Sequence, residues 1–389
     1  MKTNETKTYP QIKCPVVDIC GGCQIQHLPY ETQISQKETQ VINLLKDFGK
    51  VSPLIPMDDP YYYRNKIHAT FQSDRRGKII SGIYQAGTHN VVPVDSCLLH
   101  DQRADKIIVS IREMLRSFKM RPYDEDTKRG LLRHVLIRTG FKSNQIMVVL
   151  VLGSQVFPSR KNFVKALIKK HPEINTVVMN VNTKKTSMVL GEREQVLYGR
   201  GFIEDTLCDQ VFRISPKSFY QVNPVQTEVL YNKALELADF SGDETIIDAY
   251  CGIGTIGLIA SKHVKKVIGV ELNKDAFKDA INNAKRNNID NVFFHNDDAG
   301  DFMLKMADKK QGVDAVIMDP PRSGSSPAFL SSLVTMKPAK VVYISCNPVT
   351  LKRDLDVLVN KGYQVEEMVP VDMFPGTHHV ETICLLTKK

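Results

Sequence analysis

A cysteine between a predicted strand and a predicted helix is the residue of this chain best suited to nucleophilic chemistry. The apolar run from Val341 to Ser345 predicts a strand that stops at Cys346, and Asn347-Pro348 predicts the start of a helix. A thiol in that place faces the positive end of a helix dipole, which lowers a thiol pKa and favours the thiolate. The sequence therefore predicts that Cys346 is a nucleophile.

A glycine-rich turn in the same half of the chain predicts a site for a nucleotide-like cofactor. Gly252, Gly254 and Gly257 form a G-x-G-x-x-G pattern between a predicted strand and helix, and Glu271 ends the next strand. A carboxylate there accepts hydrogen bonds from ribose hydroxyls. The spacing leaves S-adenosylmethionine and a dinucleotide both open. A nicotinamide-dependent oxidoreductase is therefore the alternative enzyme class, although it leaves Cys346 without a role.

Two carboxylates accompany the ends of predicted strands. Asp319 is followed by Pro320 and Pro321, which stiffen the loop and fix the direction of the carboxylate. Glu381 lies at the start of an apolar strand, where a charged group costs free energy unless it is paired or functional. Two structural alternatives stay open: a plain rigid turn at Asp319, and an exposed Glu381 on an edge strand.

Alternating strands and helices must position these residues. After Asn223-Pro224, which predicts a helix start, five strand–helix units are predicted, with strands at 245–250, 266–271, 291–295, 314–319 and 340–345. Two final strands, at 364–372 and 380–387, have no helix between them and predict a hairpin. The pattern predicts an α/β fold with a doubly wound sheet, parallel except at one edge. Ligands of such sheets lie at the carboxyl ends of the strands.

In chain order, these motifs resemble the RNA uracil-5 methyltransferase family over nearly the whole sequence. The resemblance implies a C-terminal Rossmann-like domain with a terminal β-hairpin. It implies that S-adenosylmethionine contacts Gln221, Tyr250, Glu271, Asp297 and Asp319, although the family often has Asn at the position of Asp297. It also implies that Cys346 adds to carbon 6 of uracil and that Glu381 removes the proton from carbon 5. A non-catalytic RNA-binding module would have no use for both residues.

Four further cysteines form a candidate metal site. Cys14, Cys20 and Cys23 have the spacing C-x5-C-x2-C, and Cys97 lies far downstream. Four thiolates can bind zinc or an iron–sulfur cluster, and the spacing alone leaves both open. The spacing resembles that of the 23S ribosomal RNA uracil-5 methyltransferases, which implies a [4Fe–4S] cluster and a uridine of 23S ribosomal RNA as target. The same reaction on transfer RNA is the alternative.

The expected domains are an iron–sulfur segment (1–30), a helix and linker that pack on the catalytic domain (31–55), a β-rich α+β RNA-binding domain (56–215) and the catalytic domain (216–389). Only 13 residues precede Cys14, too few for the small β-barrel RNA-binding (TRAM) domain of many relatives. The middle region is therefore expected to hold RNA, with Phe219 as a stacking surface. The candidate cations are Arg64, Lys66, Arg75, Arg76, Lys78, Arg121, Lys128, Arg129, Arg133 and Arg138.

Composition is consistent with a cytoplasmic RNA-binding enzyme. The net charge is +9, which favours a polyanionic partner without requiring one. The sequence has no apolar run long enough for a membrane span, and its polar first residues do not match a signal peptide. A reducing compartment is therefore expected, where the eight cysteines serve as ligands, nucleophiles or buried thiols. We expect a monomer.

Overall fold

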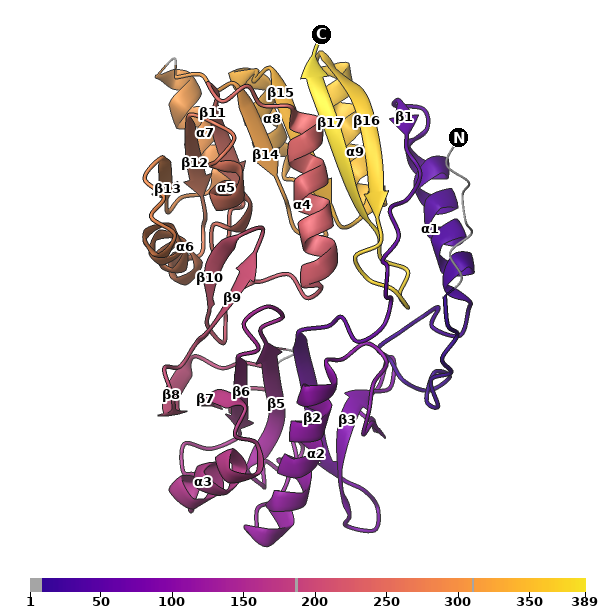
Figure 1. Ribbon diagram of the computed structural model, residues 1–389, viewed down its shortest axis with the longest axis vertical. Coiled ribbons are helices and arrows are strands. Elements are labelled where there is room, and N and C mark those ends of the chain that lie inside the picture. The colour runs from indigo at the N-terminus through magenta and orange to yellow at the C-terminus, as the bar shows by residue number, and fades with distance from the viewer. Residues whose placement is uncertain (1–8, 186–187, 310) are drawn as a thin grey trace.

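The computed structural model describes residues 9–185, 188–309 and 311–389, which form two lobes, each around a large sheet (Figure 1). The polar stretch used to exclude a signal peptide lies outside the described residues. The upper lobe has an eight-stranded sheet with the order β1-β16-β17-β15-β14-β11-β12-β13. Its strands are β1 (Lys50–Val51), β11 (Thr245–Ala249), β12 (Lys266–Val270), β13 (Val292–His295), β14 (Ala315–Met318), β15 (Lys340–Ser345), β16 (Tyr363–Val371) and β17 (Glu381–Lys388).

Strand β17 runs antiparallel to β15 and β16, whereas the other described pairs of this sheet are parallel. The predicted hairpin is therefore confirmed, but its antiparallel strand lies inside the sheet. The prediction that only an edge departs from parallel order was wrong, because β16 has the same direction as β15 and pairs with β1. The short β1 carries too little hydrophobic pattern to be recognised as a strand.

Helices cover both faces of this sheet, as a doubly wound fold requires. One face packs against α4 (Pro224–Ala238), α5 (Thr255–Ala260) and α6 (Lys274–Arg286). The other face packs against α1 (Tyr30–Leu45), α7 (Ala299–Asp308), α8 (Pro327–Met336) and α9 (Pro348–Asn360). Neighbouring strand residues serve opposite faces, as Ile246 and Ile247 do. No described helix combines the length and apolar character needed to cross a membrane.

The lower lobe contains a seven-stranded sheet with the order β4-β3-β2-β5-β6-β7-β8. Its elements are β2 (Lys66–Ser73), β3 (Ile79–Tyr84), β4 (Val91–Pro93), β5 (Leu132–Thr139), β6 (Ile146–Leu152), β7 (Ile174–Val181), β8 (Arg193–Tyr198), α2 (Gln102–Ser117) and α3 (Arg160–Lys170). Helices α2 and α3 cover one face. The exposed, charged β8 gave no strand signal in the sequence, because it lacks a buried face.

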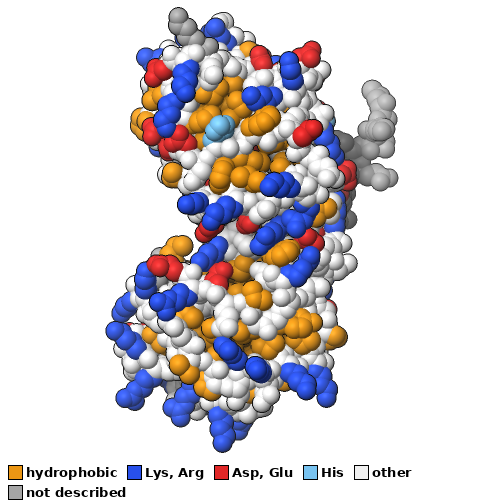
Figure 2. Space-filling view, turned by 90° about the vertical axis from the view of Figure 1, so that its left-hand side faces the viewer, with side chains coloured by type: hydrophobic (Ala, Val, Ile, Leu, Met, Phe, Trp, Pro, Cys, Tyr) orange, Lys and Arg blue, Asp and Glu red, His pale blue; other side chains and the backbone are white. Residues whose placement is uncertain are grey.

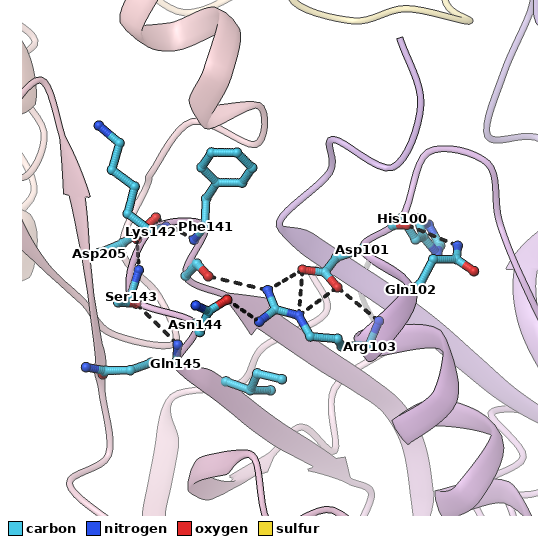
Figure 3. A network of polar contacts seen from close by, with 12 residues as sticks. His100, Asp101, Gln102, Arg103, Phe141, Lys142, Ser143, Asn144, Gln145 and Asp205 are labelled. Atoms are coloured by element: carbon cyan, nitrogen blue, oxygen red, sulfur yellow. Dashed lines mark hydrogen bonds and ion pairs between the residues drawn. The ribbon is translucent and has the colours of Figure 1, made fainter. Parts of the chain in front are cut away.

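A separate hairpin, β9 (Ile203–Leu207) and β10 (Gln210–Ile214), joins the two lobes. Its apolar residues pack against β5–β7 of the lower sheet and also share one hydrophobic core with α4 and α5. The buried Asp205 of β9 accepts hydrogen bonds from the backbone N–H groups of Phe141, Lys142 and Ser143 at 2.9–3.1 Å (Figure 3). The same turn is held from α2, where Arg103 binds both Asp101 and Asn144. The lobes therefore share one continuous core.

A buried ion pair fastens helix α1 to the upper lobe. Lys37 Nζ of α1 lies 2.7 Å from Asp372 Oδ1, just after β16, and both side chains are almost fully buried. Lys37 also donates to the carbonyl oxygen of Phe374 at 3.0 Å. The contact holds the 372–380 loop, which leads directly to Glu381.

Removing this lysine should therefore be costly. We expect Lys37→Ala to lower the free energy of unfolding by about 3–5 kcal/mol, because it leaves the charge of Asp372 buried without its partner. The double variant Lys37→Ala/Asp372→Ala should recover part of the loss. Lys50→Ala, which breaks an exposed pair with Glu367, is the matched control and should cost less than about 1 kcal/mol. Equal losses for the two lysines in urea unfolding would contradict this account.

Candidate active site

Five of the predicted site residues lie at one edge of the upper sheet. Each directly follows the carboxyl end of a parallel strand, from β11 to β15, or comes one residue later: Tyr250, Glu271, Asp297, Asp319 and Cys346. Parallel strands bring their carboxyl ends to the same edge, which is where ligands of such sheets bind.

The glycine turn after β11 has the geometry of a ligand cradle. Gly252 and Gly254 adopt positive φ angles of 58° and 84°, which residues with a Cβ rarely adopt. A Cβ built at Gly252 would meet no described atom within 4 Å, so a ligand has room to approach the backbone. The Glu271 carboxylate accepts from the N–H groups of Gly252 and Asn273 at 2.9 and 2.6 Å. These contacts hold the carboxylate beside the turn, where a ribose would lie, and the residues present fit an adenosyl group.

Two other predicted cofactor contacts differ in their surroundings. The ring of Tyr250 lies 5.1 Å from that of Phe329, at the border of the glycine turn. The carboxylate of Asp297 is 2.5 Å from Lys305 Nζ and lines a surface cavity of about 400 Å³ together with Phe293. Asp297 is therefore already paired with a cation of α7, which makes it the least available of the predicted contacts.

Cys346 lies between β15 and α9 as predicted. Asn347 is the N-cap of α9, since its side chain accepts from the N–H of Val349 at 3.1 Å, and Pro348 is the first helical residue. The amide of Asn347 also donates to the carbonyl oxygen of Arg322 at 3.1 Å. The loop that carries the thiol is thereby fastened to the loop that carries Asp319.

The expected low pKa of this thiol was wrong. Burial, together with the neighbouring carboxyl groups of Glu381 and Asp319, raises the pKa of Cys346 to about 12, although Arg322 acts in the opposite direction. Burial and two acids therefore outweigh the helix dipole. The thiol needs a proton acceptor before it can attack.

The buried Glu381 and the half-buried Asp319 form an acid pair beside Cys346. Residue Ser345 of β15 lies opposite Thr382 of β17, so the register brings the start of β17 next to the thiol. Glu381 is only 3% exposed, and its Oε2 has no hydrogen-bond partner among the described residues. Burial and the proximity of Asp319 hold the pKa of Glu381 well above its usual range, and burial raises the pKa of Asp319 to about 7. The alternative of an exposed edge-strand glutamate was wrong.

The loop before α4 carries Gln221 and Phe219 and is positioned by the lower lobe. The side chain of Asn65 donates to the carbonyl oxygen of Gln221 at 3.1 Å. Arg138 of β5 donates to the carbonyl oxygens of Ser218 and Pro216. Sequence analysis missed Asn65, whose only signal was an amide within a cationic segment. Phe219 is 65% exposed on the same loop.

Two of the predicted RNA-contacting cations are structural. Arg138 is 2% exposed, and burial lowers its pKa to about 10. Arg133 is 3% exposed and pairs with Glu125 at 2.5 Å. Neither guanidinium can reach RNA on the surface, because each is used inside the fold. Six other candidates of the set are exposed on loops: Arg75, Arg76, Lys78, Arg121, Lys128 and Arg129.

The predicted metal-ligand cysteines line one cavity of about 220 Å³: Cys14, Cys20, Cys23 and Cys97. Two thiols accept backbone hydrogen bonds, from Gly22 to Cys20 and from Leu99 to Cys97, both at 3.4 Å. Among the described residues, no three His, Cys, Asp or Glu side chains are arranged to hold a single metal ion. Four cysteine thiols are donors that suit either zinc or an iron–sulfur cluster.

The cysteine segment also contacts the loop before Glu381. The backbone N–H groups of Gln24 and Ile25 both donate to the carbonyl oxygen of Gly376 at 3.1 Å. The side chain of Gln33 accepts from the N–H of Gly376 at 2.8 Å. These hydrogen bonds connect the cysteine segment directly to the loop that positions Glu381.

Comparison with known proteins identifies the family. The model of the tRNA (uracil-5-)-methyltransferase family matches residues 29–389. An uncharacterized RNA methyltransferase of Halalkalibacterium halodurans is 43% identical over 97% of this chain and 83% of its own length. One of Clostridium tetani is 42% identical over 96% of this chain and 82% of its own length.

A solved structure agrees with these relatives. The Pyrococcus abyssi tRNA (uracil-54, C5)-methyltransferase in complex with S-adenosyl-L-homocysteine superimposes with a TM-score of 0.78 at 30% identity, over 95% of this chain and 86% of that one. A bound product of S-adenosylmethionine in that relative agrees with the cradle formed by the glycine turn. This chain therefore belongs to the family of S-adenosylmethionine-dependent RNA (uracil-5-)-methyltransferases.

Proposed function

We propose that this enzyme methylates carbon 5 of a uridine in 23S ribosomal RNA, with Cys346 as nucleophile and Glu381 as base. The observation that carries the assignment of roles is the buried Glu381 carboxyl beside the Cys346 thiol, with no hydrogen-bond partner for Oε2 among the described residues. An unpaired buried acid costs free energy, and a role in proton transfer accounts for it.

The proposed reaction uses these groups in order. The Cys346 thiol gives up its proton to solvent water, and the sulfur forms a bond to carbon 6 of uracil, so that the electrons of the 5,6 double bond form an enolate. S-adenosylmethionine would supply the methyl group from its sulfonium sulfur to carbon 5, which leaves S-adenosylhomocysteine. Glu381 then removes the proton from carbon 5, and the returning electron pair expels the Cys346 thiolate from carbon 6. Because the pKa of Glu381 is raised, its carboxylate, once ionised, holds a proton more firmly than an exposed carboxylate does.

The cleft between the lobes is the proposed entry for RNA. A cavity of about 850 Å³ lies there and is lined from both lobes, by Lys66, Arg193, Lys217 and Asn273 among others. Figure 2 shows the narrowed waist of the molecule with Lys and Arg side chains around it. Burial, followed by the charges of Arg138 and Arg64, lowers the pKa of Lys66 to about 8. A phosphate group would offset this concentration of positive charge, and Phe219 would stack on a base that has left its helix.

Four thiols around one cavity support the proposal of a [4Fe–4S] cluster. When bound, the cluster would cross-link the N-terminal segment to Cys97, and we assign it no step in the reaction.

Protein purified without air should be brown and contain about four irons per chain. Cys20→Ala should remove the iron and lower the melting temperature, while binding of S-adenosylmethionine stays unchanged because the glycine turn lies in the other lobe. The half-buried Cys208 offers a matched control, since Cys208→Ala should keep the iron. Iron analysis and thermal unfolding provide the readouts. A colourless anaerobic preparation that contains zinc would overturn the cluster assignment.

Mapping 5-methyluridine by mass spectrometry tests the choice of substrate. We expect cells that lack this protein to lose the modification from 23S ribosomal RNA, and the wild-type gene to restore it. The gene carrying Cys346→Ala should fail to do so. Loss confined to transfer RNA would overturn the ribosomal assignment and leave the chemistry in place.

A further inference from the structure

A groove at the far end of the lower lobe has no role in the site described so far. It lies between helix α3 and edge strand β8, has a volume of about 440 Å³, and is lined by Arg160, Lys161 and Lys165 of α3 and by Gln195, Val196 and Tyr198 of β8. Its lining includes no acidic residue. Figure 1 shows α3 and β8 on the same side of the lower lobe.

The cations of this groove are available to a ligand. Lys161 and Lys165 are exposed, and neither forms an ion pair with any described residue. Arg160 donates to the side chain of Gln195 at 3.0 Å, a neutral partner that leaves its charge uncompensated. The whole stretch 153–172 contains no Asp or Glu. Unpaired lysines on one face, without acids between them, form a surface complementary to a polyanion.

One exposed tyrosine ring and several apolar side chains line the groove together with these cations. Tyr198 is 42% exposed and Val196 is 49% exposed, although both belong to a strand. Val164 and Ile168 of α3 complete the lining. An aromatic ring between lysines is the combination that single-stranded nucleic acid uses, because bases stack on the ring while phosphates bind the cations.

Strand β8 connects this groove to the cleft between the lobes. Arg193, its first residue, lines the cleft, and Tyr198, its last, lines the groove. Six strand residues span about 20 Å. The two acids along this path are compensated, since Glu192 pairs with Lys184 and Glu194 lies 3.8 Å from Lys217.

We propose that the groove between α3 and β8 binds the substrate RNA outside its target loop, as the continuation of a path that begins in the cleft. This rests on the cleft being the entry for RNA. Lys161 and Lys165 would bind backbone phosphates, and Tyr198 would stack on a base. The enzyme then holds its RNA at two points, of which only one is next to Cys346.

Binding of two RNAs to one pair of variants tests this proposal. The double variant Lys161→Gln/Lys165→Gln should bind a long substrate RNA about tenfold more weakly than the wild type, and its log–log salt slope should fall by about one to two units. A short RNA with the target loop alone should bind and be methylated as before, because it cannot reach the groove. Tyr198→Ala should lower the affinity for the long RNA without changing the salt slope of binding. Lys337→Gln/Lys361→Gln, two exposed lysines at the ends of α8 and α9, is the matched control.

Each outcome has one meaning. Unchanged affinity for the long RNA would overturn the proposal, and the groove would then suit an acidic protein instead. An equal loss for both RNAs would also overturn it, because the lysines would then belong to the cleft. The double variant could bind only the long RNA more weakly while the wild type adds no methyl group to carbon 5 of either RNA. That result would support the groove as an RNA-binding site and overturn the proposed reaction.

Discussion

Cys346→Ala is expected to reduce methyl transfer by at least about four orders of magnitude, because the bond to carbon 6 can no longer form. Binding of S-adenosylmethionine should remain, since the glycine turn and Glu271 hold the cofactor without the thiol. Transfer of a labelled methyl group to RNA and calorimetric titration of the cofactor measure the two effects separately.

A trapped intermediate gives this prediction a second readout. With RNA that contains 5-fluorouridine, the wild type should form a complex that survives denaturation, because fluorine cannot leave carbon 5 as a cation. Cys346→Ala should form none. Cys208→Ala, a cysteine of the β9–β10 connection, should trap as well as the wild type. Methylation by Cys346→Ala above trace rates would refute the covalent mechanism.

Glu381→Gln is expected to separate methylation from release. The amide cannot take the proton from carbon 5, so a methylated covalent adduct should accumulate on ordinary RNA while turnover falls by about 10²–10⁴-fold. Gel shift under denaturing conditions detects the adduct, and mass spectrometry shows its methyl group. Glu367→Gln on β16 changes surface contacts with Lys50 and Ser52 and should turn over as the wild type does.

A different result would change the roles assigned to Glu381 and Asp319. If Glu381→Gln turns over normally and no adduct appears, the base is another group, and Asp319 is the nearest carboxyl to test. If no adduct appears and turnover is lost, Glu381 acts before methylation, as the acceptor of the thiol proton. The high pKa of Cys346 makes a proton acceptor necessary for that step.

The local chemistry of the catalytic half could be predicted from the sequence. The turn at Gly252 and Gly254 needs positive φ angles, and Asn347-Pro348 can only cap and begin a helix, so both are readable from neighbouring residues. Alternating strand and helix patterns predicted the parallel strands of the upper sheet because each pattern is confined to one element. That topology in turn predicted that the candidate site residues lie at the edge formed by the carboxyl ends of the strands.

Long-range burial could not be predicted from the sequence. Arg133 and Arg138 read as surface cations, but each is buried and donates to carbonyl oxygens distant in the chain. Those of Asn182 and Lys184 accept from Arg133, and those of Ser218 and Pro216 accept from Arg138. The thiol of Cys346 was expected to have a low pKa from its own helix, yet burial, followed by the charges of Glu381 in β17 and Asp319 after β14, raises that pKa.

The sequence by itself determined which residues are candidates for the chemistry, because residue type and local spacing single out the proposed nucleophile, the acids and the glycine turn. Only the tertiary structure decided how they act together. The register of β17 against β15 places Glu381 beside Cys346, and Asn65 of the lower lobe fixes the loop of Gln221. The exposed β8 has no hydrophobic pattern of its own. It lines the proposed RNA-binding groove only because it lies between α3 and the cleft. Burial and electrostatic coupling depend on distances between segments far apart in the chain, which no local pattern encodes.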